Sequence, residues 1–117
     1  MEAVSPEQRA VCDRFRVEPI PAAVDLKVGI APNVKEGVRP VNAIRHLNVG
    51  DTTGWYIWGG DSDLRRRGDD FFVPLHVAHL REWCPEIEPY LALPPGWGVI
   101  VEDGYEDVWF DPGYLVE

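Results

Sequence analysis

PPGWGVIVEDGYEDVWFD, at residues 94–111, has the pattern of two strands joined by a polar turn. The prolines and Gly96 end whatever precedes them, because proline cannot continue a helix and glycine favours turns. Residues 97–101 then predict a strand, residues 102–106 an acidic turn, and residues 107–110 the returning strand. We therefore expect the chain to close with a β-hairpin that carries acids at its tip.

Two short helices are predicted before this hairpin. Pro74 suits the first position of a helix, and apolar residues from Leu75 to Trp83 follow at helical spacing. Pro85 ends this helix, and residues 86–91 predict a second one. At the amino end, Ser5-Pro6-Glu7-Gln8 combines an N-cap serine, a proline and a glutamine placed to reach back, which predicts a helix over residues 5–16.

Branched and aromatic residues predict three further strands, at residues 24–31, 38–47 and 55–58. Helices grouped between strands, without an alternating strand–helix rhythm, favour an α+β fold with a mostly antiparallel sheet. The length of 117 residues suits one domain over residues 1–117.

The amino terminus lacks the basic and apolar segments of a secretory signal, so we expect a cytoplasmic protein. No apolar run is long enough to suggest a membrane span. Cys12 and Cys84 have no neighbouring cysteine that would form a CxxC motif, and we expect both to be buried free thiols.

Charge is distributed unevenly along the chain. Residues 1–50 hold seven Lys or Arg and six Asp or Glu, whereas residues 51–117 hold four and fourteen, which together give the net charge of −9. No Lys or Arg follows Arg81. An acidic surface attracts basic partners and repels nucleic acid, so we expect a protein-binding module that does not bind nucleic acid or a membrane.

The sequence offers no catalytic residue, and we expect neither an enzyme nor a cofactor. No glycine-rich phosphate-binding motif is present, and the acids around Cys84 would raise the pKa of a thiol nucleophile. The nearest approach to a metal site is His76, His79 and Glu82, spaced three apart on one predicted helix. Such a histidine pair is usually solvated surface, so we expect no metal.

The five tryptophans leave a choice between core and contact roles. Large aromatic residues usually build the core of a small domain, but Trp55 and Trp58 fall on opposite faces of a predicted strand, so one of them could be exposed. A pocket lined by tryptophans for a small ligand or a carbohydrate is the alternative to a protein-binding surface. A structural role in a larger assembly is a third possibility.

Two groups of motifs carry a family resemblance: Thr53-Gly54-Trp55-Tyr56-Ile57-Trp58-Gly59-Gly60-Asp61, and Pro95-Gly96-Trp97 with Gly104-Tyr105-Glu106-Asp107-Val108-Trp109. In these motifs the chain resembles bacterial polymorphic-toxin immunity proteins of the thirty-third numbered family, formerly a domain of unknown function. The resemblance covers about residues 25–111 and leaves the first helix outside.

This resemblance implies a small cytoplasmic protein that binds a cognate toxin and blocks it. A nuclease toxin presents a basic surface to its substrate, and an acidic protein with aromatic anchors can occupy that surface. On this hypothesis the partner-binding residues are Trp55, Asp61, Glu102, Asp103, Glu106, Asp107 and Trp109.

Overall fold

The computed structural model describes residues 4–48, 50–60 and 71–115. Asp61 therefore lies outside the described residues. The elements are α1 (Pro6–Arg14), β1 (Lys27–Ile30), α2 (Pro32–Lys35), β2 (Val41–Arg45), β3 (Thr52–Gly59), β4 (Val73–His76), η3 (Val77–Glu82), η4 (Pro85–Tyr90), β5 (Trp97–Glu102), β6 (Tyr105–Phe110) and η5 (Pro112–Leu115), where η denotes a 3₁₀ helix.

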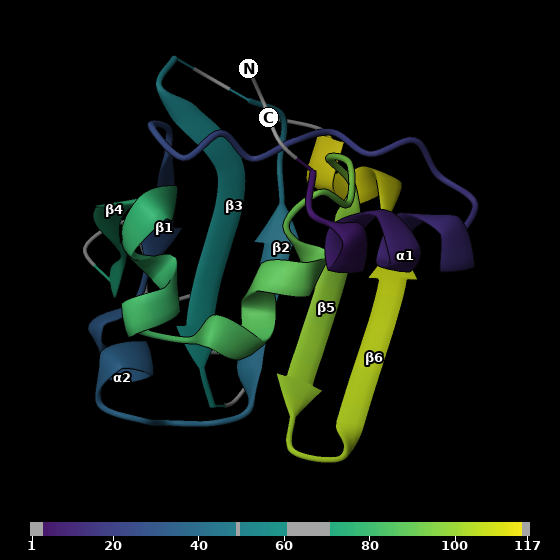
Figure 1. The fold of residues 1–117 in the computed structure, drawn as a ribbon. Helices are drawn as coiled ribbons and strands as arrows, with labels where there is room; N and C mark the ends of the chain where they lie inside the picture. The colour runs from purple at the N-terminus through teal and green to yellow at the C-terminus, as the bar shows by residue number, and fades with distance from the viewer. Residues whose placement is uncertain (1–3, 49, 61–70, 116–117) are drawn as a thin grey trace.

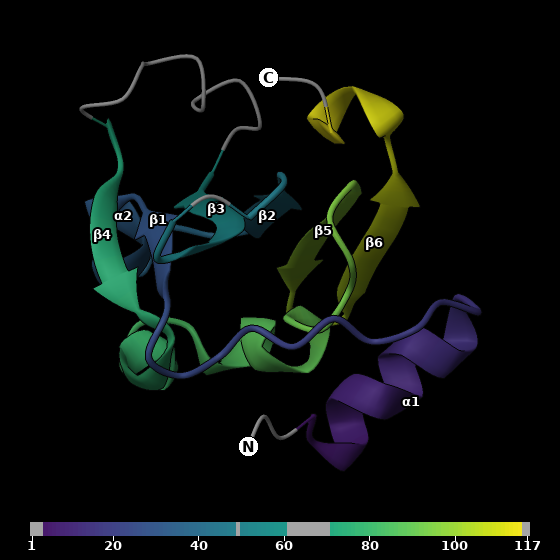
Figure 2. The same ribbon diagram turned by 90° about the horizontal axis from the view of Figure 1, so that it is seen from above.

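One six-stranded sheet, in the order β4-β1-β3-β2-β5-β6, organises the fold (Figure 1). Only the β1–β3 pair is parallel, and the other four pairs are antiparallel. The helices α1, η3 and η4 lie on one face of this sheet, and η5 lies on the other (Figure 2). The predicted α+β fold with a mostly antiparallel sheet and a closing hairpin is confirmed.

The main core fills the space between the sheet and the helices. Strand residues at alternate positions, such as Val28 and Ile57, face Leu80 and Ile87 of the 3₁₀ helices. A smaller cluster on the opposite face contains Ala31, Ile44 and Trp58. Both faces of the central strands are therefore covered, which explains why β2 is buried at every position.

The first helix forms as its sequence predicts. Ser5 accepts a hydrogen bond from the Gln8 backbone N–H, and the Gln8 side chain accepts one from the Ser5 N–H, so the capping box is complete. Arg16 adopts the left-handed conformation with φ 60°, which ends the helix before the predicted residue 16. Cys12 and Cys84 are buried free thiols, as expected.

The helix predicted to begin at Pro74 is wrong. Val73–His76 forms β4, an antiparallel edge strand beside β1, and the following segment is the 3₁₀ helix η3. An edge strand tolerates proline because the N–H that is missing would face away from the sheet. Proline is thus compatible with both the start of a helix and an edge strand. Pairing with β1 determines that this segment is a strand.

Candidate functional site

The hairpin tip places three polar side chains together in solvent. Asp103 and Gly104 form the turn, with Gly104 in the left-handed region at φ 77°, while Glu102 pairs with Tyr105. The strands therefore extend closer to the tip than the predicted turn over residues 102–106. Glu102, Asp103 and Tyr105 are exposed, and 54% of the Tyr105 surface is accessible to solvent.

A groove of about 650 Å³ separates the hairpin tip from η4. Its lining combines acids and aromatic rings from these two elements with one guanidinium: Arg39, Pro85, Glu86, Tyr90, Val101, Glu102, Asp103, Gly104, Tyr105 and Glu106. Four carboxylates thus face a single positive charge. Such a concave acidic site concentrates cations near its walls.

Glu106 is engaged within the molecule. Its carboxylate accepts hydrogen bonds from Arg14 at 2.6 and 3.2 Å, and from the hydroxyl of Tyr90. The bond from Arg14, followed by that from Tyr90, lowers the pKa of Glu106, whereas burial and this bond raise the pKa of Tyr90 to about 12. Glu106 therefore ties α1 and η4 to β6.

Glu86, the second engaged acid, lies 2.6 Å from the Nε of Arg39. The Arg39 guanidinium also donates to the carbonyl oxygens of Val34, Val38 and Trp83, which fixes its position. The side chains of Glu102 and Asp103, in contrast, form no hydrogen bond or ion pair with any described residue. The groove thus holds two fixed and two free carboxylates.

Asp107 and Trp109 lie along β6 beyond the groove. Asp107 is exposed, and its side chain forms no hydrogen bond or ion pair among the residues that the structure describes. Trp109 is half-buried against Gly98, and its indole N–H donates to the Tyr114 hydroxyl at 2.9 Å. Trp109 packs against the smaller cluster, on the opposite face of the sheet from η4.

Trp55 does not belong to this surface. It is 1% exposed in the main core, and its indole N–H donates to the carbonyl oxygen of Leu91 at 2.9 Å. Trp58 is on the opposite face of β3, as the alternation predicts, yet it is only 2% exposed. The expectation that one of the pair is exposed is wrong, because the sheet is covered on both faces.

The three metal candidates do not share an α-helix. His76 ends β4, while His79 and Glu82 lie on η3 with 3.5 Å between Nδ1 of His79 and the nearer carboxylate oxygen. Within residues 4–48, 50–60 and 71–115, no three His, Cys, Asp or Glu side chains are arranged to hold a metal ion.

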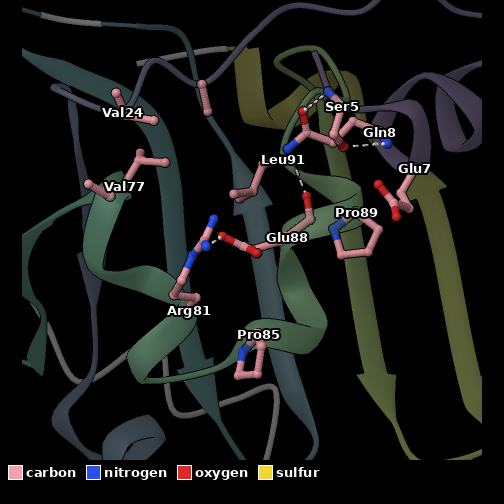
Figure 3. A pocket seen from close by; sticks show the side chains of 12 residues that line it. Ser5, Glu7, Gln8, Val24, Val77, Arg81, Pro85, Glu88, Pro89 and Leu91 are labelled. Carbon is pink, nitrogen blue, oxygen red and sulfur yellow. Dashed lines mark hydrogen bonds and ion pairs between the residues drawn. The ribbon is translucent and has the colours of Figure 1, made fainter. Parts of the chain in front are cut away.

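A second pocket, of about 420 Å³, opens between α1, η3 and η4 (Figure 3). Val24, Val77 and Leu91 supply apolar surface, and the Arg81 Nε lies 3.5 Å from a carboxylate oxygen of Glu88. Neither this pocket nor the acidic groove includes a tryptophan in its lining.

Two residues that line the groove, the aromatic Tyr90 and the ion-paired Glu86, were not predicted from the sequence. Glu86 and Tyr90 lie on η4, 11 and 7 residues before the hairpin begins at Trp97, and only tertiary packing brings η4 beside the tip. Tyr105 was within reach of sequence reasoning, since it directly follows the Asp103-Gly104 turn. The sequence-based prediction named the acids next to Tyr105 as partner-binding residues and did not include Tyr105 itself.

None of the helices in the described part of the chain has the length and apolar character needed to cross a membrane. Comparison with the curated proteins and with the solved structures gives no match. Comparison with models of protein families, in contrast, gives a match over most of the chain.

Residues 7–111 match the model of the Imm33-like domain, which defines a class of immunity proteins. The chain belongs to the Imm33-like family. The match begins at residue 7 and so includes α1, whereas the resemblance inferred from the motifs covered about residues 25–111 and left the first helix outside. Membership of an immunity family implies a protein that neutralises a toxin.

Proposed function

We propose that this protein neutralises a bacterial toxin by binding a basic surface of the toxin in the groove between η4 and the β5–β6 tip. Family membership supports toxin binding, and the observation that supports this location is the groove itself, where four carboxylates face one guanidinium. Neutralisation then follows from occupancy of the toxin surface, without a catalytic step.

The groove suits an arginine or lysine side chain of the partner. Carboxylates accept short, charge-assisted hydrogen bonds from such groups, and a guanidinium also stacks on aromatic rings. Tyr90 and Tyr105 supply rings in the lining beside the acids. Cation–π contacts of this kind add to the charge attraction once water is excluded.

The free and fixed acids have different parts in this proposal. Glu102 and Asp103 can bind a cationic partner without losing an internal bond, and Asp107 extends the acidic surface along β6. Glu106 and Glu86 instead hold α1 and Arg39 in place. Trp109 packs on the opposite face of the sheet from η4, so it could act as an apolar anchor only outside the groove. Trp55 loses the role of an anchor because it is buried.

A cytoplasmic location is part of the proposal. Cys12 and Cys84 are both free, which suits a reducing compartment. The partner would then be met in the cytoplasm.

The test is charge reversal at the free acids, Glu102→Lys with Asp103→Lys, measured as association with the cognate toxin. Because both side chains are exposed and unbonded, the variant should fold normally. Its association rate at low salt should fall by about tenfold or more, with a weaker salt dependence, because electrostatic steering is lost. Cells that express the toxin should lose protection.

Asp25→Lys with Glu36→Lys is the matched control, since these exposed acids lie outside the groove and change the net charge equally. The control variant should keep most of the association rate. If both variants slow association equally, the net charge rather than the groove governs binding. If neither does, the acidic groove is not the interface.

The alternative of a tryptophan-lined ligand pocket has little support from the geometry. The two grooves described above contain no tryptophan. A third pocket, of about 370 Å³ beside β1, β3 and β4, includes Trp55 in its lining, but Trp55 is only 1% exposed and offers no open ring face on which a ligand could stack. Binding to a stacking pocket would respond little to salt, which separates this alternative from the protein-binding proposal in the same assay.

A further inference from the structure

The two edges of the sheet, β4 and β6, differ in what they offer to another strand. An edge strand exposes backbone N–H and C=O groups at alternate residues, and a neighbouring chain can pair with them. Protein sheets usually blunt such edges with proline, lysine, bulges or short length. Only one of the two edges here is blunted by proline.

The β4 edge is closed by Pro74. Val77 N–H donates to the Leu26 carbonyl oxygen at 2.9 Å, and the register places Leu75 opposite Val28. Bonding alternates along an antiparallel ladder, so Leu75 and Val73 point their backbone groups inward, whereas Pro74 and His76 point outward. Pro74 therefore removes one of the two outward donors of this four-residue strand.

The β6 edge remains open. Asp111 N–H donates to the Gly96 carbonyl oxygen at 2.8 Å, next to the pair Trp97–Phe110. The same alternation directs the backbone groups of Glu106, Val108 and Phe110 away from β5. In the described part of the chain, no residue forms a hydrogen bond with these outward groups.

Helix α1 does not close this edge. Figure 2 shows α1 on the helix-bearing side of the sheet, below β6. Arg14 reaches Glu106 from that side, and Phe110 packs against Trp97 with 5.6 Å between ring centroids. The contacts thus engage side chains on one face of β6 and leave its backbone edge accessible.

We propose that the open edge of β6 accepts an extended, basic segment of the partner protein as a seventh strand of the sheet. This inference rests on the proposed function for the existence of a protein partner, and it adds the mode of binding. Backbone pairing supplies affinity in such strand addition, and side chains at alternate positions supply specificity. Glu106, Val108 and Phe110 provide the backbone groups.

Charge selects the occupant. The side chains of Asp103 at the turn and Asp107 on β6 are exposed and form no bond to other described residues, and no Lys or Arg follows Arg81 in the sequence. Lysine or arginine side chains of an added strand would meet these acids. A second copy of the chain, with its own net charge of −9 and acidic β6, would instead bring like charges together.

The experiment titrates isotope-labelled protein with a synthetic peptide of about eight residues in which lysine and valine alternate, up to about 1 mM, and follows backbone amide resonances. We expect saturable shifts centred on Glu106, Val108 and Phe110, with slower hydrogen exchange at these three amides. One control peptide carries glutamate in place of lysine. Another keeps the lysines but is N-methylated at every residue, which removes its backbone donors.

Val108→Pro tests the backbone directly, because it should remove an outward donor while leaving the bonds to β5 intact, as Pro74 does in β4. Peptide affinity should fall by about tenfold or more from the lost hydrogen bond and the added ring. Val108→Ala, the matched control, keeps the N–H and should change affinity by about twofold at most. If Val108→Pro does not fold, the test is hydrogen exchange at the Glu106, Val108 and Phe110 amides of the parent protein, which should slow when the peptide binds.

Absence of saturable binding, equal binding of the N-methylated peptide, or shifts centred on β4 or on the groove alone would each overturn strand addition. A dimer in sedimentation that Val108→Pro dissociates would assign the edge to a second copy and would also overturn it. The peptide experiment uses no toxin, so its failure leaves toxin neutralisation standing. Failure of toxin binding with intact peptide binding would refute only the proposed function.

Discussion

Replacement of Arg45 by methionine should destabilise the protein more than removal of any surface cation. Arg45 is 0% exposed, and its guanidinium donates to five backbone carbonyl oxygens, those of Ile20, Pro21, Thr53, Leu91 and Leu93, at 2.8 to 3.3 Å. It also lies 5.6 Å from the centroid of the Trp55 ring. Burial lowers the pKa of this guanidinium to about 10, so it stays charged at neutral pH.

Methionine would fill part of the volume but donate no hydrogen bond. The Leu91 carbonyl oxygen would still accept a hydrogen bond from Trp55, whereas the other four carbonyl oxygens would lose the bond from the Arg45 guanidinium. Each lost hydrogen bond costs about 1 kcal/mol net. Methionine also avoids the cost of burying a charge, but this gain offsets only part of the loss, so we expect the free energy of unfolding to fall by about 3–5 kcal/mol. At about 4 °C per kcal/mol for a chain of this size, Tm should fall by about 12–20 °C.

Urea unfolding followed by tryptophan fluorescence measures this loss, and the buried Trp55 beside Arg45 makes the signal sensitive to the site. Arg81→Met is the matched control: its side chain is 72% exposed and 3.5 Å from Glu88, so its loss should be within about 0.5 kcal/mol. If Arg45→Met lies within about 1 kcal/mol of the parent protein, the five carbonyl bonds do not stabilise the fold as argued.

Two further variants test contacts of β6. Glu106→Gln removes the carboxylate that binds Arg14 and Tyr90. The pKa of Glu106 in the folded protein lies below the ordinary 4.5. The stability that this carboxylate contributes is therefore fully present above about pH 4.5 and is lost as the pH falls through the folded-state pKa. Urea unfolding from about pH 7 to about pH 3 should show the gap between parent and variant shrinking, and a constant gap would contradict the assignment. In Gly98→Ala the new methyl group would lie 2.5 Å from the Trp109 ring, so unfolding should show a loss of about 1–3 kcal/mol, and an unchanged midpoint would mean that Trp109 moves freely.

Local signals in the sequence predicted the elements that depend on neighbours in the chain. The Ser5 and Gln8 side chains make the cap of α1 through bonds that span three residues, and Asp103-Gly104 makes the hairpin turn. The predicted helix at Pro74 failed because proline signals both a helix start and an edge strand. Only the pairing of Leu75 with Val28, far away in the chain, separates these outcomes.

The candidate site divides in the same way. Glu102, Asp103 and Asp107 are exposed at or near the hairpin tip, where their sequence pattern placed them. The bonds of Glu106 to Arg14 and Tyr90 span 92 and 16 residues, and no local pattern indicates that this acid is engaged. Trp55 was assigned to a surface because alternation gives the face of a strand but not what covers that face.

The sequence by itself determined the capped first helix, the closing hairpin with acids at its tip and the concentration of negative charge after residue 50, because each depends on residue identity at short range. Tertiary structure alone decided the strand order, the groove beside η4, the burial of Arg45 and the open β6 edge. These features arise where segments distant in sequence meet, and the packing that brings them together determines which polar groups are bonded and which remain free for a partner.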